Sequence, residues 1–224
     1  MIVSVNDQNF WEERYQQGTT AWDLGEPAPP FVTFLQSSNA PAPGRTAVLG
    51  CGRGYDALLF ATYGFEVVGF DFAASAIEEA LRWQQLLITQ PSILKGSGKY
   101  FPTSAKFLQR DIFELTKEFS GHFDYVIEHT CFCAIPPEKR YDYVQLVESI
   151  LKPNGQLFGL FFTHSRPGGP PFGITPAEIQ QYFQEKFQIL DLHPVTNSTP
   201  SRHGQEHWGH LAVRKGESPP DRDI

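Results

Sequence analysis

The sequence predicts an α/β fold, in which a mostly parallel sheet of seven strands carries helices on both faces. Short runs rich in β-branched and aromatic residues alternate with longer helical patterns, as in strand–helix–strand units. A glycine-rich stretch, residues 50–54, stands between one such run and a helical pattern, where α/β sheets hold ligands. The length of 224 residues suits one domain.

The first 40 residues precede this alternation and form a segment of their own. Asp7 is a suitable N-cap for a first helix, and Gly18 ends that helix. A loop, Thr19–Pro30, leads to a short helix over Phe31–Gln36. The breaker Pro41–Gly44 then separates this segment from the core.

The core, residues 41–215, is predicted to hold all seven strands. The expected strands are Thr46–Leu49, Glu66–Phe70, Lys106–Gln109, Phe123–Glu128, Gln156–Thr163 and a closing hairpin of Phe187–Leu192 with Trp208–Val213. The expected helices are Asp56–Tyr63, Ser75–Thr89, Glu138–Leu151 and one that Thr175 caps, Pro176 opens and Phe183 ends. Residues 90–104 are interpreted as a surface insertion and residues 216–224 as a flexible tail.

Composition excludes several classes of partner. The 18 Lys and Arg residues against 25 Asp and Glu residues give a net charge of −7, and no basic cluster indicates nucleic-acid binding. The longest apolar run, Leu157–Phe162, is far shorter than the roughly 20 residues of a membrane span. No signal peptide is visible, and three cysteines make no disulfide framework. We therefore expect a cytoplasmic protein with no nucleic-acid or membrane partner. Separately from the composition, we expect a monomer or weak dimer that acts on a small molecule or small anion.

The glycine-rich stretch carries the strongest functional signal. Its glycines stand at Gly50, Gly52 and Gly54, and Tyr55 occupies the place of the third glycine of a dinucleotide fingerprint. Asp56 adds a carboxylate to the first turn of the following helix, where it would repel a phosphate. A cationic ligand such as S-adenosylmethionine (SAM) fits better, since it carries a sulfonium and no phosphate. An NAD-dependent oxidoreductase and a plain strand-to-helix turn are the alternatives.

Two further acids stand at strand ends. Asp71 ends the second strand and is placed to accept both ribose hydroxyls, with Phe72 as a neighbouring cofactor contact. Asp111 follows the third strand and can accept from an adenine amino group, while the N–H of Ile112 reaches a ring nitrogen. Alternatively, Asp111 caps a short helix at residues 112–116.

On these residues the sequence resembles a class I SAM-dependent methyltransferase with a Rossmann-like sheet. It is most similar to the thiopurine S-methyltransferase superfamily, and within it to the thiol and halide (thiocyanate) methyltransferases. The motifs that carry the resemblance are Phe10–Tyr15, Trp22–Gly25, Leu49–Asp56, Phe132–Arg140, Leu151–Gly155 and Gly168–Phe172.

The resemblance implies that the N-terminal segment is a helical lid. Trp11 and Trp22 would close over the cofactor, where an aromatic face attracts a sulfonium, although core packing is the usual fate of Trp. Tyr15 stands where plant halide enzymes tend to carry another Trp, which implies a substrate contact. The fourth strand would end beside the transferred methyl, which places Glu128 at the cofactor and His129 at the reaction.

His129 either takes part in catalysis, by contacting the nucleophile or accepting a thiol proton, or hydrogen-bonds the backbone. Phe172 and Arg202 are the further candidate substrate contacts, with a solvated loop arginine as the alternative for Arg202. Cys131 and Cys133 lack partners for a zinc site, so no metal is expected.

The expected reaction is in-line SN2 transfer of the SAM methyl to a small soft nucleophile: a thiol, hydrosulfide, halide or thiocyanate. Because a soft anion needs no strong base, the protein aligns the reactants and excludes water. A thiopurine-like or metalloid (selenium or tellurium) methyltransferase is the alternative enzyme, and a non-catalytic SAM-binding module is the alternative outside enzymes.

Overall fold

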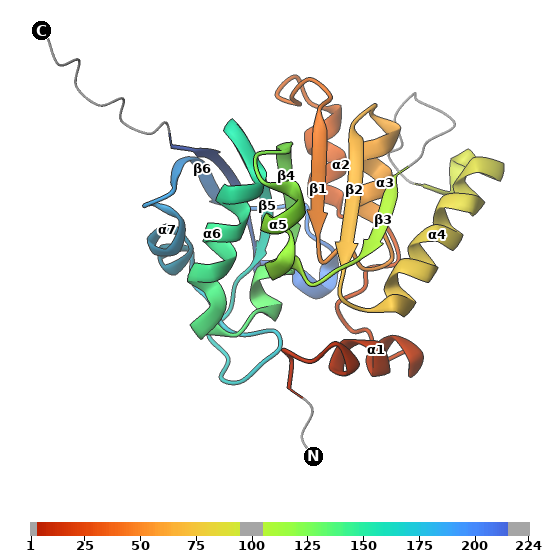
Figure 1. The fold of residues 1–224 in the computed structure, drawn as a ribbon, viewed down its shortest axis with the longest axis horizontal. Helices are drawn as coiled ribbons and strands as arrows, with labels where there is room; N and C mark the ends of the chain where they lie inside the picture. The colour runs from red at the N-terminus through yellow and green to blue at the C-terminus, as the bar shows by residue number, and fades with distance from the viewer. Residues whose placement is uncertain (1–3, 95–104, 215–224) are drawn as a thin grey trace, which may run out of the picture.

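The computed structural model describes residues 4–94 and 105–214, and within them a twisted sheet of seven strands (Figure 1). The strands are β1 (Arg45–Leu49), β2 (Glu66–Asp71), β3 (Lys106–Gln109), β4 (Phe123–His129), β5 (Leu151–Phe162), β6 (Phe187–Pro194) and β7 (Glu206–Val213). They lie in the order β3-β2-β1-β4-β5-β7-β6. Strands β1 to β5 are parallel, and β7 runs antiparallel to both of its neighbours. The expected fold class and closing hairpin are confirmed.

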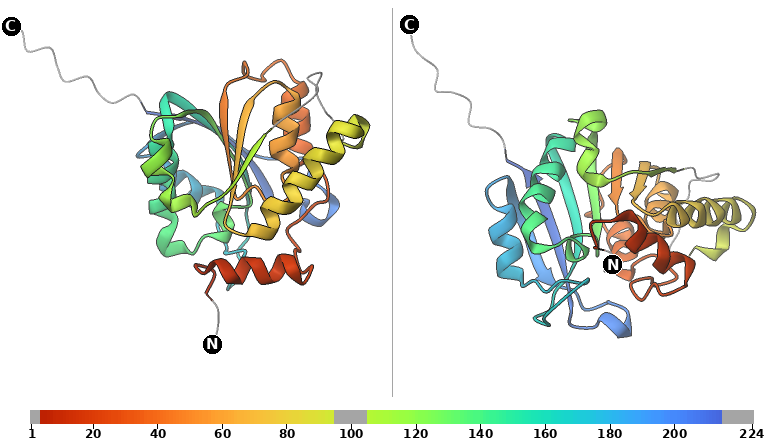
Figure 2. Two further views of the ribbon diagram at one scale, coloured as in Figure 1. Left: turned by 45° about the vertical axis from the view of Figure 1, so that its right-hand side comes forward. Right: turned by 60° about the horizontal axis from the view of Figure 1, so that its bottom comes forward.

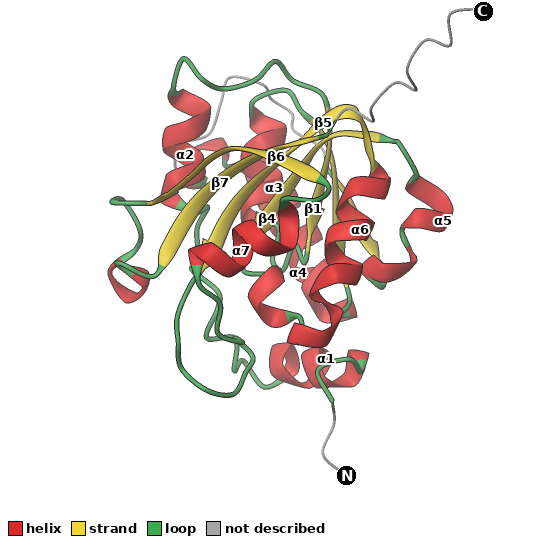
Figure 3. Ribbon diagram, turned by 90° about the vertical axis from the view of Figure 1, so that its left-hand side faces the viewer, coloured by secondary structure: helices red, strands yellow, loops and turns green. Residues whose placement is uncertain are grey.

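Helices cover both faces of this sheet (Figure 3). The helices are α1 (Gln8–Gln16), α2 (Pro29–Gln36), α3 (Tyr55–Thr62), α4 (Ala74–Thr89), α5 (Thr116–Phe119), α6 (Arg140–Ile150) and α7 (Pro176–Phe183). Alternate strand residues serve the two faces, as the side-chain period of a strand requires. Val126 belongs to the core under α6 and α7, while its neighbour Ile127 belongs to the core under α2, α3 and α4.

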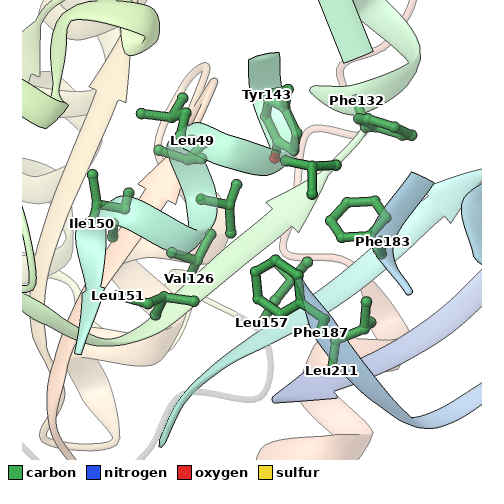
Figure 4. Packing of buried hydrophobic residues seen from close by; sticks show 14 of the residues in the cluster. Leu49, Val126, Phe132, Tyr143, Ile150, Leu151, Leu157, Phe183, Phe187 and Leu211 are labelled. Atoms are coloured by element: carbon green, nitrogen blue, oxygen red, sulfur yellow. The ribbon is translucent and has the colours of Figure 1, made fainter. Parts of the chain in front are cut away.

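The core under α6 and α7 is built from large apolar side chains. Phe183 of α7 and Phe187 of β6 pack beside Leu157 of β5 and Leu211 of β7 (Figure 4). All four are fully buried. Burying such a side chain contributes roughly 1.5–3 kcal/mol to the free energy of folding. This packing therefore stabilises the part of the sheet whose strand ends carry the site.

The order of the strands positions the site. The chain moves outward from β1 to β2 and β3, then returns to place β4 on the other side of β1. Neighbouring parallel strands that leave in opposite directions open a crevice at their carboxyl ends. Helix α1 lies across that end of the sheet (Figures 1 and 2).

Several local predictions are confirmed by their hydrogen bonds. Asp7 accepts from the N–H of Asn9 at 2.9 Å and caps α1. Thr175 and Glu178 form a reciprocal capping box at the start of α7. The cap residues therefore fix the first turns of these two helices as the sequence indicated.

Helix α6 and strand β5 differ from the prediction. The helix begins at Arg140 rather than Glu138, because Pro137–Lys139 form a 3-10 turn. Strand β5 begins at Leu151, before the expected break. Its pairing with β4 passes from Leu151 directly to Gln156, so residues 152–155 bulge out of the ladder. The predicted stop is thus an interruption inside a strand.

Two predicted segments fall wholly or partly outside the described residues. In the surface insertion, Pro91–Ile93 form a 3-10 turn, and residues 95–104 are not described. The predicted tail, residues 216–224, also lies outside the described part of the chain. Among the helices of residues 4–94 and 105–214, none has the length and apolar character to span a membrane.

Candidate active site

A cavity of about 490 Å3 lies at the carboxyl ends of the central strands. Residues that end or follow β1, β2, β3 and β4 line one side of it, among them Gly50, Asp71, Asp111 and Thr130. The N-terminal lid segment, residues 4–40, lines the opposite side. The view onto the strand ends in Figure 2 shows α1 in front of this region. Trp22 and Arg202, which are 180 positions apart in sequence, therefore meet at one site because the strands end at one edge.

The glycine loop passes closely between β4 and the lid. Gly50 has a φ of +59°, and a Cβ at this position would lie 3.0 Å from the Sγ of Cys131. Gly52 has a φ of +53°, and a Cβ there would lie 3.2 Å from the hydroxyl of Tyr15. Because glycine has no Cβ, it adopts the positive φ without strain and avoids both steric clashes. Gly50 lines the cavity, whereas Gly52 faces the lid and Asp71 behind it.

Asp71 is held by backbone donors and still faces the cavity. Its Oδ2 accepts from the N–H of Gly52 at 2.8 Å, and its Oδ1 accepts from the N–H of Ala73 at 2.9 Å. Burial outweighs these bonds and raises the pKa of the carboxyl group. Each oxygen retains a further lone pair, so the group can accept hydrogen bonds from two ligand hydroxyls. Phe72 lines the same wall.

Asp111 is a helix cap, as one of the two interpretations of the sequence held, and it also lines the cavity. Its Oδ1 accepts from the N–H of Phe113 at 2.9 Å and caps a 3-10 turn over Ile112–Glu114. Asp111 and Ile112 also line the cavity. A carboxylate has a second oxygen, so the cap leaves an acceptor for a ligand.

Three aromatic rings of the lid segment line the cavity. Trp22 meets Trp11 edge-on, with 5.5 Å between ring centroids, and meets Tyr15 edge-on at 5.8 Å. The indole N–H of Trp22 donates to the Tyr15 hydroxyl at 3.4 Å, and that of Trp11 donates to the carbonyl of Val5 at 2.9 Å. Through these contacts the three rings form a continuous aromatic wall of the cavity. Such a wall suits a sulfonium, because an aromatic face attracts a cation.

Charged contacts fasten the lid segment to α4. Glu12 accepts from the backbone N–H of Ser75 at 3.1 Å and from its hydroxyl at 2.5 Å. Burial acts to raise the pKa of Glu12, but the hydrogen bonds from Ser75 prevail and lower it. Arg53 of the glycine loop pairs with Asp23 of the lid loop and with Glu79 of α4. An acid at a helix N-terminus also interacts favourably with the helix dipole.

His129 lies behind the cavity wall and is not among the lining residues. Its Nδ1 is 2.7 Å from Oδ2 of Asp56, and its Nε2 is 2.8 Å from Nη1 of Arg202. Asp56 does not line the cavity either, and its Oδ1 accepts from the N–H of Ala28 at 2.8 Å. The structure thus corrects two expectations of position: His129 bonds two side chains instead of facing the acceptor or the backbone, and Asp56 faces His129 and α2 instead of the ligand.

Glu128 and Phe172 also lie elsewhere than expected. Glu128 is fully buried beneath the cavity, where it accepts from the N–H of Phe132 and the hydroxyl of Tyr143 at 2.9 and 2.7 Å. Burial raises its pKa to about 7. The backbone N–H of Phe172 donates to the carbonyl of Cys133, its carbonyl accepts from Arg140, and the residue does not line the cavity. The adjacent Pro170 and Pro171 occupy the cavity wall that Phe172 was expected to form.

Arg202 is buried, with 6% of its surface exposed, so the interpretation as a solvated loop arginine is wrong. It lines the cavity, donates to Glu206 at 3.1 Å and donates to the carbonyl oxygen of Trp22. Its guanidinium carbon lies 5.7 Å from the ring centroid of Phe162, and that of Arg166 lies 5.8 Å from the same ring. Phe162, the last residue of β5, was missed, although the strand-end rule that found Asp71 would have indicated it.

The cysteines at the cavity are neutral thiols. Cys131 and Cys133 line it, and burial raises the pKa of Cys131 well above its usual range and that of Cys133 to about 12. Neither thiol is therefore a nucleophile or a base at neutral pH. Within the described residues, no group of three or more His, Cys, Asp or Glu side chains is arranged to hold a metal ion.

Comparison with known proteins identifies the family. The family model described as thiopurine S-methyltransferase matches residues 6–216. The chain belongs to this family. It is therefore a SAM-dependent methyltransferase, and the interpretations as an oxidoreductase or as a non-catalytic module are wrong.

Two relatives and one solved structure illustrate the similarity. Probable thiol methyltransferase 2 of Arabidopsis thaliana is 35% identical over 181 residues, which cover 80% of this chain and 74% of the relative. Thiocyanate methyltransferase 1 of Brassica oleracea is 31% identical over 205 residues, covering 91% and 84%. The structure of Burkholderia thailandensis 1,6-didemethyltoxoflavin-N1-methyltransferase has a TM-score of 0.67 at 18% identity, covering 93% and 87%, and shares the fold.

The cavity fits the cofactor of this family. Asp71 offers paired acceptors for ribose hydroxyls, and Gly50, which has no side chain, lines the same cavity. The wall of Trp11, Tyr15 and Trp22 suits a sulfonium. When bound, SAM supplies an electrophilic methyl group on that sulfonium.

Proposed function

We propose that the chain methylates a small, soft, anionic nucleophile: thiolate, hydrosulfide, thiocyanate or halide. The observation that carries the proposal is the pair Arg166 and Arg202, whose guanidinium groups both lie within 6 Å of the Phe162 ring at the cavity wall. The acids among the described lining residues are Asp71 and Asp111, which stand at the ends of β2 and β3. The basic lining residues are Arg14, Lys139, Arg166 and Arg202, and we place the acceptor beside the pair Arg166 and Arg202 at Phe162.

Arg202 retains donors for such an anion. A guanidinium has five N–H groups, and bonds to His129, Glu206 and the carbonyl of Trp22 take three of them. The two that remain are available to an anionic ligand. Phe162, Pro170 and Pro171 surround the same region with apolar surface, which strips water from the anion and makes it a better nucleophile.

The protein contributes alignment and water exclusion rather than a base. Both ring nitrogens of His129 are engaged, and the thiols of Cys131 and Cys133 are neutral. A soft anion attacks without giving up a proton, so the absence of a positioned base among the described lining residues matches this class of acceptor. Bringing an anion to a sulfonium in a dry cavity neutralises charge as the reaction proceeds, and holding both in line supplies further acceleration.

The relatives named for thiol and thiocyanate support the same acceptor class. We further propose that the enzyme works in the cytoplasm as a monomer or weak dimer, on a small molecule and without nucleic acid or a membrane. Three free cysteines suit a reducing compartment, and a net charge of −7 disfavours nucleic acid.

An acceptor panel with methyl-labelled SAM tests the proposal. The panel contains thiocyanate, hydrosulfide, iodide, a thiophenol, a thiopurine and selenite, and both volatile and non-volatile products are counted. We expect the small soft anions to exceed the thiopurine and selenite by at least about tenfold in kcat/KM. A preference for the thiopurine or for selenite would replace this proposal with the thiopurine-like or metalloid alternative.

A further inference from the structure

One line of hydrogen bonds joins the glycine-loop helix to the lid. Asp56 at the start of α3 bonds His129, His129 bonds Arg202, and Arg202 donates to the carbonyl oxygen of Trp22. The guanidinium of Arg202 can only donate, so Nε2 of His129 must be the acceptor. The ring proton therefore sits on Nδ1 and is donated to Asp56. We call these three side chains the Asp56–His129–Arg202 relay.

The relay holds the lid loop at both ends. Arg202 fixes the carbonyl of Trp22, and Oδ1 of Asp56 accepts from the N–H of Ala28 at 2.8 Å. Residues 22–28 are thus clamped between two partners that His129 connects. The side chains of His129 and Asp56 are only 13% and 12% exposed, so solvent offers little competition for these bonds.

We propose that His129 is a positioning residue that orients Arg202, so that closing the lid and forming the acceptor site are one event. The acceptor half of this inference rests on the function proposed above. Arg202 is the shared element, because its guanidinium touches both the lid carbonyl and the cavity wall.

The guanidinium of Arg202 has two different partners on Nη1, the carboxylate of Glu206 and a ring nitrogen of His129. Glu206, 2% exposed, lies 3.1 Å from Nη1 of Arg202 and offsets its charge. An ion pair alone fixes a distance but leaves the planar group free to turn about the carboxylate. The lone pair of His129 at 2.8 Å adds a second, directional contact on the same nitrogen. Two partners on Nη1 fix the plane of the guanidinium, and with it the N–H groups that face the cavity.

The test compares two substitutions of His129. His129→Phe keeps a ring and removes both hydrogen bonds, whereas His129→Gln supplies an amide oxygen that can accept from Arg202. We expect His129→Phe to raise the KM for the acceptor about tenfold while the KM for SAM changes less than about threefold. His129→Gln is expected to recover most of the loss, which a merely space-filling role would not allow.

Hydrogen exchange of residues 22–28 provides a readout that needs no acceptor. Exchange in this stretch, measured by mass spectrometry on the full chain with SAM, should speed up about tenfold or more in His129→Phe. His210→Phe is the matched control, because His210 bonds a side chain, Gln156, that is not part of the relay and, like His129, does not line the cavity. It should leave both readouts unchanged.

The outcomes separate this inference from the proposed function. If the wild-type protein methylates no small soft anion, the proposed function fails, and hydrogen exchange still decides whether the relay holds the lid. If His129→Phe folds and neither exchange nor the acceptor KM changes, the relay is overturned. Should His129→Phe not fold, Arg202→Met replaces it: adding His129→Gln to Arg202→Met must then cost nothing further, and an additive loss would overturn the coupling.

Discussion

At the scale of single residues, Asp71 offers the sharpest test of where the cofactor lies. Removing its carboxylate in Asp71→Ala takes away the acceptors for two hydroxyls, and we expect SAM affinity to fall about 10- to 100-fold by calorimetry. Asp124→Ala is the control, because Asp124 bonds Lys152 and the N–H of Arg45 away from the cavity. Unchanged SAM affinity in Asp71→Ala would show that the cofactor lies elsewhere.

At the scale of elements, two glycines allow the cost of a positive φ to be measured apart from the cost of a steric clash. Gly50 and Gly121 have nearly the same φ, +59° and +60°, but a Cβ on Gly50 meets Cys131 whereas a Cβ on Gly121 meets nothing within 4 Å. The positive φ alone should cost either alanine variant roughly 1–2 kcal/mol of unfolding free energy, and the contact with Cys131 should add to that cost in Gly50→Ala. Only Gly50→Ala should also abolish SAM binding at concentrations that saturate the wild type. Equal SAM affinity in the two variants, measured by calorimetry, would contradict a close ligand approach at Gly50.

The attachment of α1 is a second prediction at this scale. Glu12 reaches the first turn of α4 through Ser75, whereas the neighbouring Glu13 is exposed. We expect Glu12→Gln to raise the Kd for SAM about three- to tenfold, because the neutral amide holds Ser75 less tightly and the lid opens more often. Glu13→Gln should leave the Kd unchanged in the same titration. Identical values for both variants would mean that this contact does not hold the lid.

For the whole molecule, the raised pKa of Glu128 predicts how the free energy of unfolding depends on pH. Folding raises its pKa from 4.5 to about 7, chiefly through burial. Its contribution is therefore complete below about pH 4.5 and is lost as the pH rises through about 7, on the order of 3 kcal/mol in all. Glu128→Gln removes this titration, so the variant should gain Tm relative to the wild type between about pH 5 and about pH 8. Parallel Tm curves for the two proteins would refute the buried titration.

Much of this molecule follows from local pattern. Alternating strand and helix signals predict the sheet, and the strand-end rule finds Asp71 and Asp111 because it needs only the position of each strand. The site is less predictable where it depends on packing between distant segments. His129 and Asp56 are 73 positions apart, and Arg202 and Trp22 are 180 apart. Their partners are set by the strand order, in which β7 enters between β5 and β6, and no local pattern encodes that order.

The buried thiols have a consequence for the durability of the enzyme. Cys131 and Cys133 line a cavity whose cofactor is an alkylating agent, and Cys51 lies in the glycine loop beside it. A thiolate there would be alkylated by the cell's own methyl donor and the protein would inactivate itself. Burial raises the pKa of all three thiols, so they remain protonated and unreactive at neutral pH. The desolvation that makes an incoming anion more nucleophilic thus also keeps these thiols protonated and protects the protein from self-methylation.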